Sequence, residues 1–554
     1  MRIALITTPL GARSGIGDFT RQLLPYLRER AEVEIFVEDR CFVPGEGSKP
    51  ASSIQPRDYD QILYQIGNEQ AHAFMRPMLS ALGGTVLLHD WVLFDQAVAG
   101  RPELAKGGLR GLIAAVEEGG IRAAKIWKSA RKRRAPLLDE PVEGASPLAF
   151  GWHELEEHGI WSSRSAGLHL VRRDAQAMKL SLFIPEGRKL ELREGEDVLR
   201  EISAKRDERI ELELPMSGAL TLQIKVSGKA LTESQRGNAD PRELGVFLSE
   251  ISFQRAGEWT AEPLHSSQLI TEDGQGLSAS RFALPFNRGV VRRADGFIVH
   301  SEWMRDEIVR DRNAPTPVLI VPHGIERRWD DFDRVAARAE LPLAWRDDFI
   351  VASLGTLQTH KRVAALLDGA ARARERGVKV RVLLIGEERP RELDLSSEIR
   401  RLDMIDSVEV TGWVEEPRAH ALLSAADVCV NLRGPTTGGA SGGASQALGL
   451  GRGVIVSDLP ELAELPSDAT LRVPVGEGEA EALCEHFVSL SSDPALLKQM
   501  ESAARNYVEE RAHWSHVAET CVEALKQFPT PRASRRGIIQ NAIRQRTAQR
   551  EEAQ

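Results

Sequence analysis

Residues 2–39, RIALITTPLGARSGIGDFTRQLLPYLRERAEVEIFVED, decide the class of fold. The apolar stretch RIALITT at 2–8 is typical of a short buried strand, and a glycine-rich turn follows it. Leu23, Leu24 and Leu27 then repeat at helical spacing, and VEIFVED at 33–39 is a second strand. A strand, a turn, a helix and a strand in this order predict a parallel α/β domain.

The same pattern continues along the chain and then begins again. QILYQIGN at 61–68 and TVLLHDW at 85–91 are apolar strands that end in polar residues. Near residue 347 a second α/β unit starts with the strand DFIVASLGT, a turn that contains Lys361, and the helix VAALLDGAARARERG. Function in parallel sheets sits at the carboxyl ends of the strands, so the polar residues there are the candidates for a site.

A stretch of different character separates these two units. From about Gly151 to about residue 255 the helix–strand alternation stops, and segments such as MKLSLFIPE, RIELELP and LTLQIKVSG alternate apolar and polar residues. Strands at this spacing predict an all-β sandwich. The α/β pattern returns at ADGFIVHSEWM, so the sandwich is expected to be inserted in the first α/β domain.

Composition excludes several classes of protein. The 554 residues are 42% hydrophobic and 28% charged, which excludes a disordered or collagen-like chain. The net charge of −9 argues against a nucleic-acid partner. Four scattered cysteines, without a C-x-x-C pair, exclude a disulfide scaffold and a zinc ribbon. Because no apolar run approaches the ~20 residues of a membrane helix and the first residues lack signal-peptide features, we expect a cytoplasmic protein.

Two segments are strongly basic. IRAAKIWKSARKRR at 121–134 holds seven basic residues and no acidic one, and residues 531–554 hold six arginines against two glutamates. A solvated helix face and a frayed end are one interpretation. The alternative is attraction to an anionic membrane surface or a lipid phosphate, at the inner face of the plasma membrane.

Several motifs, in order, resemble the family-4 glycosyltransferases. RSGIGDFTRQLLPYL, YDQILYQIGNEQAHAFM and TVLLHDWVLFD resemble segments of that family's first domain, as do ADGFIVHSEWM and VPHGI. GTLQTHKRVAALLDGA and RGPTTGGASGGASQALGLGRGVIVSDLPELAELP resemble its donor domain. GWHELEEHGIWS and NADPRELGVFLSEISF are similar to an accessory β-sandwich of bacterial polysaccharide-assembly enzymes.

The resemblance implies a GT-B fold, in which two Rossmann-like domains face a cleft. We expect an N-terminal domain at 1–147 and 257–335, a sandwich inserted at 148–256, a C-terminal nucleotide-sugar domain at 336–528, and a basic tail at 529–554. The final helix is expected to cross back to the first domain, as it does in GT-B folds.

Lys361 is the first candidate for catalysis. A nucleotide diphosphate leaving group needs positive charge in the transition state, and Lys361 lies between a strand and a helix. Arg362 is a second candidate cation, and Thr356 is expected beside them in the donor site. The alternative is a pair of solvated loop charges.

A glycine-rich turn is the second candidate, with Gly438, Gly439, Ser441, Gly442 and Gly443 before the helix SQALGLG. Free amides at a helix N-terminus bind phosphate, and glycines let the backbone approach closely. A flexible surface loop is the alternative.

The first domain contributes two further pairs. Gly15 and Gly17, at the first strand–helix turn, are expected near the cleft, although their spacing with Gly11 does not match G-x-G-x-x-G. His89 and Asp90 end an apolar strand; the resemblance implies that His89 positions the reacting sugar, and Asp90 could orient it. A structural turn and a hydrogen-bonded strand-end histidine are the alternatives.

The donor loop departs from the family in one respect. The family's two acidic or polar positions align with Gly438 or Gly439 and with Gln446, which is expected to hydrogen-bond the ribose without charge. A lost charged hydrogen bond costs about 1.5–3 kcal/mol, or about one to two decades in affinity or rate. The loss leaves open a repair by another residue, an altered donor, or a non-catalytic relative.

The sequence therefore leads to one main hypothesis. It is a metal-independent, retaining glycosyltransferase without a cofactor, which moves a hexose from a nucleotide diphosphate sugar to a bacterial surface glycan or lipid-linked acceptor. One alternative is a catalytically impaired relative that binds glycan or acts as a scaffold in polysaccharide assembly. A nucleotide-binding epimerase of GT-B shape is a third, and it would need acids in the cleft.

Overall fold

The computed structural model describes most of the chain. The described residues are 1–11, 14–45, 47–132, 148–156, 159–172, 175–195, 197–216, 218–228, 245–255, 257–262, 280–312, 314–388 and 395–530. Outside them lie residues 531–554 of the predicted tail at 529–554, the end of the basic run at 133–134 and residues 238–244 of the accessory motif. Within the described residues, no helix is both long and apolar enough to cross a bilayer.

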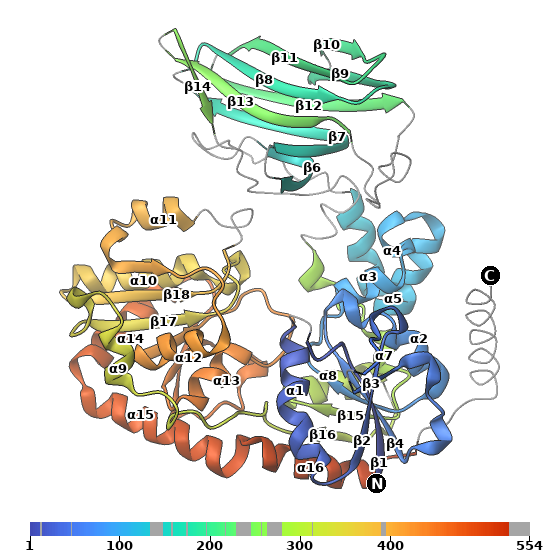
Figure 1. Ribbon diagram of the computed structural model, residues 1–554, viewed down its shortest axis with the longest axis vertical. Coiled ribbons are helices and arrows are strands. Elements are labelled where there is room, and N and C mark those ends of the chain that lie inside the picture. Colours follow the sequence, from blue (N-terminus) through green and yellow to red (C-terminus); the bar gives the residue numbers. More distant parts are fainter. Residues whose placement is uncertain are drawn as a thin grey trace. The chain divides into compact units, whose positions relative to one another are not determined.

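The first parallel sheet belongs to the N-terminal domain, and its order is β16-β15-β5-β4-β1-β2-β3 (Figure 1). Its strands are β1 (Arg2–Ile6), β2 (Glu32–Val37), β3 (Ser48–Pro50), β4 (Gln61–Ile66), β5 (Thr85–Leu88), β15 (Gly296–Val299) and β16 (Val318–Ile320). All of these neighbours pair in parallel. Helices of this domain are α1 (Gly15–Arg28), α2 (Met75–Leu82), α3 (Phe94–Gly100), α4 (Glu103–Lys106), α5 (Gly108–Lys132), α7 (Arg288–Val291) and α8 (Glu302–Arg312).

Helix α1 starts at Gly15, earlier than the segment TRQLLPYLRERA that the sequence predicts as helical. The reason is its cap, because the hydroxyl oxygen of Ser14 accepts the Gly17 amide at 3.2 Å. Gly15 and Gly17 therefore lie in the first turn of the helix and not in a loop before it.

The second parallel sheet has the order β19-β18-β17-β20-β21-β22. Its strands are β17 (Phe349–Leu354), β18 (Val380–Ile385), β19 (Val408–Val410), β20 (Val428–Asn431), β21 (Val454–Ser457) and β22 (Thr470–Val473). Its helices are α9 (Arg334–Ala339), α10 (Val363–Glu375), α11 (Leu395–Arg401), α12 (Glu416–Ala425), α13 (Gly442–Gly449), α14 (Glu479–Ser492) and α15 (Pro494–Tyr507). The second sheet follows the strand order 3-2-1-4-5-6 of Rossmann-like domains, and the first sheet has the same order with β16 as a seventh strand at its edge. This confirms the predicted α/β class.

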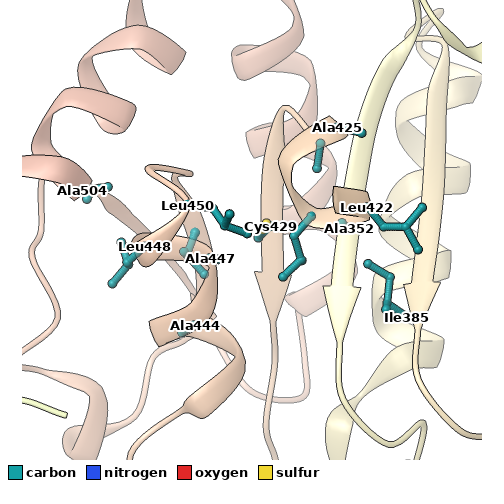
Figure 2. Close-up of a cluster of buried hydrophobic side chains, with 14 of the residues drawn as sticks. Ala352, Ile385, Leu422, Ala425, Cys429, Ala444, Ala447, Leu448, Leu450 and Ala504 are labelled. Atoms are coloured by element: carbon teal, nitrogen blue, oxygen red, sulfur yellow. The ribbon is translucent and has the colours of Figure 1, made fainter. Parts of the chain in front are cut away.

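Small side chains let α13 lie close to the second sheet. Figure 2 shows Ala447 and Leu450 beside Cys429 of β20, and all three belong to the buried core of this domain. The nearby Ala444 is fully buried. This close packing places the first turn of α13 at the carboxyl ends of β17 and β20, because a Cβ on Gly443 would lie 3.0 Å from the Leu354 carbonyl oxygen.

The last helix, α16 (Trp514–Gln527), packs on the N-terminal domain, as predicted. Its buried side chains join Leu23 and Leu27 of α1 in one core; they are Trp514, Val517, Ala518, Cys521, Val522 and Leu525. The chain leaves the first domain near Ile325 and returns beside it, since the Ile325 amide donates to the Ala512 carbonyl at 2.8 Å. The last helix of the segment predicted as the C-terminal domain, 336–528, therefore packs in the core of the first domain.

The insertion is all-β and antiparallel. Its strands are β6 (Leu148–Glu156), β7 (Gly159–Arg172), β8 (Ala177–Ile184), β9 (Arg188–Glu194), β10 (Asp197–Ser203), β11 (Glu208–Pro215), β12 (Gly218–Gly228), β13 (Phe247–Arg255) and β14 (Glu258–Glu262). Hydrogen bonds join them in one sheet of order β10-β9-β12-β7-β13-β8-β11, with β6 on β7 and β14 on β13. Alternate residues of β8 are buried, as the pattern predicts.

Two details of the predicted insertion need comment. Strand β14 ends at Glu262, past the predicted boundary at 256, because it pairs back onto β13 across a short turn. Hydrogen bonds join the nine strands in one sheet, whereas a sandwich has two separate sheets. The sandwich packing therefore stays a prediction.

Candidate functional site

The candidate site begins at the point where the strand order of the second sheet reverses. Strands β17 and β20 are neighbours there, and their connections leave in opposite directions. Lys361 follows β17, at the end of the short 3-10 turn Thr359–Lys361, and Arg433 follows β20. Open α/β sheets bind ligands at such a switch point, in the crevice beyond the carboxyl ends of the strands.

Lys361 is a largely buried cation. Burial, and secondarily the charge of Arg433, lower the pKa of its ammonium to about 7, while the carboxylate of Asp90 opposes this shift. Two cations and one carboxylate are therefore close enough to influence each other at this position. A dianionic group placed there would favour the protonated form of Lys361.

Arg433 is held by the backbone of the glycine-rich loop. Its Nη1 donates to the carbonyl oxygens of Gly439 and Ala440, at 3.1 Å each. Its Nε is buried and has no hydrogen-bond partner within the described part of the chain. A buried guanidinium nitrogen without a partner costs free energy, so this atom is available to an anionic ligand.

His360 adds a second polar atom of this kind. Its Nδ1 is buried without a hydrogen-bond partner among the described residues. Burial, then the charges of Lys361 and Arg281, lower the pKa of the imidazole to about 4, so the ring is neutral near pH 7. The ring of Phe282 lies against it, with centroids 5.7 Å apart.

The first turn of α13 completes this side of the site. Ser441 is the N-cap: its hydroxyl oxygen accepts the Ala444 amide at 3.2 Å and its hydroxyl donates to Asn431 Oδ1 at 2.5 Å. The Ser441 side chain is thus engaged in capping. Gly442 faces open space, so a ligand can reach its backbone.

Gly438 and Gly439 lie tightly against the N-terminal domain. A Cβ on Gly438 (φ +77°) would lie 2.6 Å from the Trp303 ring, and one on Gly439 would lie 2.5 Å from the His89 carbonyl oxygen and 2.6 Å from Asp90 Oδ1. Only glycine fits at either position in this arrangement. The two domains therefore meet across the backbone of this loop.

Hydrogen bonds fasten the same loop to the strand end after β5. The amides of Trp91 and Val92 both donate to the Thr437 carbonyl oxygen at 2.9 Å. The Thr437 hydroxyl donates to Asp90 Oδ1 at 2.6 Å, and Asp90 Oδ2 accepts the Asn68 amide at 3.0 Å. Asp90 consequently faces the loop and the two cations.

The ring of His89 faces the interior of its own domain. Its Nε2 lies 2.7 Å from Gln65 Oε1, and its ring meets Phe19 edge-on at 4.6 Å. Burial, then the neighbouring His300 and His323, lower the pKa of His89 well below its ordinary value. The sequence places His89 at the cleft; the structure brings its carbonyl group to the loop and leaves the neutral ring behind it.

A cavity of about 100 Å³ lies between α1 and α13. Its lining includes Gly15, Asp18 and Phe19 from α1, and Gly442, Ser445 and Gln446 from α13. Gln446 Oε1 lies 3.2 Å from His420 Nε2. Gly17 does not line this cavity, because its amide points to the Ser14 cap.

Arg362 takes a different place from the one expected. It has a left-handed backbone (φ +54°), and its Nε donates to both carboxylate oxygens of the buried Glu479, at 2.7 and 2.5 Å. Because this ion pair occupies the guanidinium, Arg362 faces the start of α14. Thr356 is half-buried after β17, close to Gly386.

The structure thus gathers Asp90, Lys361, Gly438 and Gly439 in one place, and Gly15, Gly442 and Gln446 around the adjoining cavity. Arg433 is a candidate site residue that sequence reasoning missed. One signal could have found it, since it directly follows the apolar strand DVCVNL, as His89 follows TVLL.

A comparison with protein families identifies the second parallel-sheet region. Residues 348–493 match the family described as glycosyl transferases group 1. This segment contains Lys361, Arg433 and the loop that ends at Gln446. The match establishes a glycosyltransferase domain in this part of the chain and supports a glycosyltransferase as the class of enzyme. No curated protein matches the sequence.

Solved structures give weak similarities. Sucrose-phosphate synthase from Thermosynechococcus elongatus is 14% identical, covers 95% of this chain and 98% of its own, and has a TM-score of 0.48. HepE from Anabaena, in complex with UDP and glucose, is 18% identical over 45% of this chain and 67% of its own, with a TM-score of 0.38. A glycosyltransferase from Rickettsia africae is 14% identical over 42% and 63%, with a TM-score of 0.34. Since these scores are below 0.5, no property is transferred from them.

Proposed function

We propose that this protein is a retaining glycosyltransferase of family 4 and GT-B type. In this proposal it moves a sugar from a nucleotide diphosphate sugar to a bacterial surface glycan or lipid-linked acceptor. The observation that carries the proposal is the pair of cations, Lys361 and Arg433, beyond neighbouring strand ends and beside the first turn of α13. The group 1 match over the same residues supports it.

The cations and amides suit a diphosphate leaving group. Negative charge grows on the departing phosphate in the transition state, and preorganised donors in a dry site stabilise it strongly. Lys361, the Arg433 Nε and the amides of Gly442 and Gly443 are the proposed donors. They would supply this charge stabilisation from the chain itself, so the proposed reaction needs no metal ion or cofactor.

Retention follows from substitution on one face of the sugar. The bond between the anomeric carbon and the phosphate oxygen breaks, and the bond from that carbon to the acceptor oxygen forms on the same face. The acceptor's proton passes to the departing phosphate oxygen, which balances the charge. After the transfer, Lys361 and Arg433 contact the released nucleotide diphosphate, and their positive charges offset its negative charge.

Asp90 is the proposed substitute for the acidic residue that the donor loop lacks. Its Oδ1 lies 2.6 Å from the place where a Cβ of Gly439 would be. The first domain therefore presents a carboxylate where the loop has no side chain, and this carboxylate would accept a hydroxyl of the transferred sugar. The Asn68 amide and the Thr437 hydroxyl position it.

Donor binding requires the loop to move. Ligand pockets for molecules of this size have volumes of about 300–1,000 Å³, and the cavity beside the site has about 100 Å³. We therefore assign the present contacts of Gly438 and Gly439 to a closed arrangement. Closure after binding would exclude water and limit hydrolysis of the donor. The antiparallel insertion is the proposed holder of the acceptor glycan or of a partner protein.

One observation favours a second function. Gly438 or Gly439, and Gln446, stand where the resembled family has acidic or polar-charged residues, so the loop offers the donor fewer charged hydrogen bonds. A relative that binds glycan or nucleotide without turnover would tolerate this loss. The two functions differ in whether the bound donor is consumed.

The decisive experiment combines calorimetry with an assay of nucleotide release. UDP, GDP, ADP, TDP and their common sugar conjugates are titrated into the full chain, and released nucleotide diphosphate is then followed with the conjugate that binds. Lys361→Ala is compared with Lys379→Ala, which removes an exposed cation of the same domain. Binding and release that depend on Lys361 alone support the transferase. Binding without release supports the second function. Absence of nucleotide binding in a folded sample refutes the transferase and favours a relative that binds glycan.

A further inference from the structure

Helix α5 carries a surface that the proposed sugar transfer does not use. It spans Gly108–Lys132 and bends at Gly120, whose φ of 75° interrupts the helix. Before the bend, the segment from Leu109 to Gly119 extends over about 15 Å at 1.5 Å per residue. Its two faces differ sharply in what they contact.

The inner face packs against the rest of the N-terminal domain through buried side chains and a buried ion pair. Ala114 and Ala115 are fully buried, and Glu118 accepts Arg76 Nη1 at 2.5 Å and the Gly289 amide at 3.1 Å. Arg76 also donates to the Phe286 carbonyl at 2.6 Å. Because a buried ion pair is strongly destabilised when one partner is withdrawn, the helix cannot rotate about its axis.

The outer face is apolar. Leu109, Ile113 and Val116 are 74%, 49% and 40% exposed, and Ile121, in the turn after the bend, is 70% exposed. Spacings of four and three residues put the first three on one stripe of the helix. Since the inner face is locked, these side chains cannot turn toward the core.

Cations flank this stripe. Arg110, Arg122 and Lys125 are exposed on the same helix. The acidic Glu117 is paired with Arg101 at 2.6 Å, and Arg101 also pairs with Glu103 and Glu118. Downstream, the basic run reaches 134 without an acidic residue. The exposed part of α5 thus combines aliphatic side chains with three exposed cations.

We propose that the outer face of α5 binds the surface of an anionic lipid bilayer. Aliphatic side chains would enter the boundary between headgroups and acyl chains, and the cations would contact the lipid phosphates. A second copy of the chain fits less well, because a two-fold contact would bring the cations of both copies together. The stripe is also far smaller than the ~1,000 Å² of a specific protein interface.

Co-sedimentation of the full chain with vesicles tests this surface. One set contains phosphatidylcholine alone, and the other contains phosphatidylcholine with phosphatidylglycerol. The apolar variant is Leu109→Gln, Ile113→Gln and Val116→Gln, and the cation variant is Arg110→Gln, Arg122→Gln and Lys125→Gln. Matched controls change equally exposed residues elsewhere: Val335→Gln with Leu343→Gln, and Arg57→Gln with Lys379→Gln and Lys498→Gln.

We expect the unchanged protein to sediment with the anionic vesicles only. The apolar variant should lose at least about tenfold in partition, and the cation variant about fivefold for each charge removed. The two controls should bind like the unchanged protein. All variants should keep nucleotide binding and melting temperature, which separates this surface from the sugar-transfer site.

Three results would overturn the proposal. The first is a partition that both α5 variants leave unchanged. The second is a dimer in sedimentation velocity that the apolar variant dissociates, which would assign the stripe to a second copy. The third is a fall in the melting temperature of the apolar variant, which would show that the stripe is already covered within the protein.

Discussion

The two parallel-sheet domains share a strand order but carry opposite chemistry at their strand ends. In the N-terminal domain the strand ends hold His89, His300 and His323, whose rings are buried and neutral. In the C-terminal domain the corresponding edge holds Lys361 and Arg433. The same fold thus carries buried neutral rings at one set of strand ends, beside the carboxylate of Asp90, and two cations at the other.

This difference shows that the position of a site and its charge have separate origins. The strand order determines where a site can form, namely at the switch point beyond β17 and β20. The side chains directly after the strands determine its charge. All three histidine rings lie against Phe19 within the first domain, and His323 also lies against Trp514. The Arg433 guanidinium instead faces the glycine-rich loop.

Loss of Lys361 tests the cations at the strand ends of the C-terminal domain. It should cause the largest fall in the rate of transfer. Lys361→Ala removes a donor to the leaving group, so transfer should fall by about 10²–10³-fold, as for one oxyanion donor. Steady-state assays with the donor found by calorimetry measure this loss. Lys361→Arg keeps the charge and should retain more activity. Near-normal turnover of the alanine variant, with unchanged melting, would remove Lys361 from the mechanism.

Acid should lower the free energy of unfolding of the N-terminal domain, because its strand-end histidines are buried and neutral. Burial lowers the pKa of His300 to about 4 and of His323 to about 3, against 6.5 when unfolded. Between these values the unfolded state binds more protons, so their stabilisation is complete above pH 6.5 and is lost as the pH falls toward 4. Each ring contributes roughly 3 kcal/mol to this loss at about 1.4 kcal/mol per pKa unit.

Urea unfolding at a series of pH values measures this effect. His323→Gln should flatten the fall in the free energy of unfolding below pH 6.5, after allowance for its own cost at neutral pH. A slope that stays unchanged in this variant would mean that other groups cause the acid sensitivity.

Exchanging the strand-end residues separates affinity from stability. Arg433→Gln should weaken nucleotide diphosphate binding by about ten- to a hundredfold, as expected for a charged hydrogen bond. His300→Gln, at a strand end of the other domain, should lower the melting temperature and leave the affinity nearly unchanged. Calorimetry and thermal melting of both variants test this; equal losses of affinity would contradict the division of roles.

The smallest expected effect is on turnover, and it comes from the glycine-rich loop between the two parallel-sheet domains. Gly439→Ala places a methyl group against His89 and Asp90, so the closed arrangement becomes strained and turnover should fall several-fold to about tenfold. Gly11→Ala is the matched control, because a Cβ there meets open space outside the proposed donor site. Equal kcat values for the two variants would show that closure at Gly439 does not limit the reaction.

Much of the architecture could be predicted because it rests on local patterns. The apolar strands, the antiparallel insertion and the return of α16 all follow periodicity or resemblance. Helix starts were less accessible: α13 begins at Gly442, ahead of the predicted SQALGLG, because the cap at Ser441 outweighs the low helix propensity of glycine.

The site was predictable only in part, because its pairings join distant residues. Arg362 and Glu479 lie 117 residues apart, and nothing near either one shows that their side chains meet. Asp90 and Thr437 are 347 residues apart. Lys361 could be named from its place after a strand, but Arg433 required the knowledge that β17 and β20 are neighbours.

The return of α16 has a consequence for the order of events on the ribosome. The first strand to be synthesised belongs to a core that still lacks Trp514, Val517 and Leu525. At about 5–20 residues per second, this core waits roughly half a minute or more for its last helix. The antiparallel insertion and the second parallel sheet have by then been translated. The domain whose strands emerge first is therefore the last to mature, and chains released before α16 would expose its docking surface to chaperones and proteases.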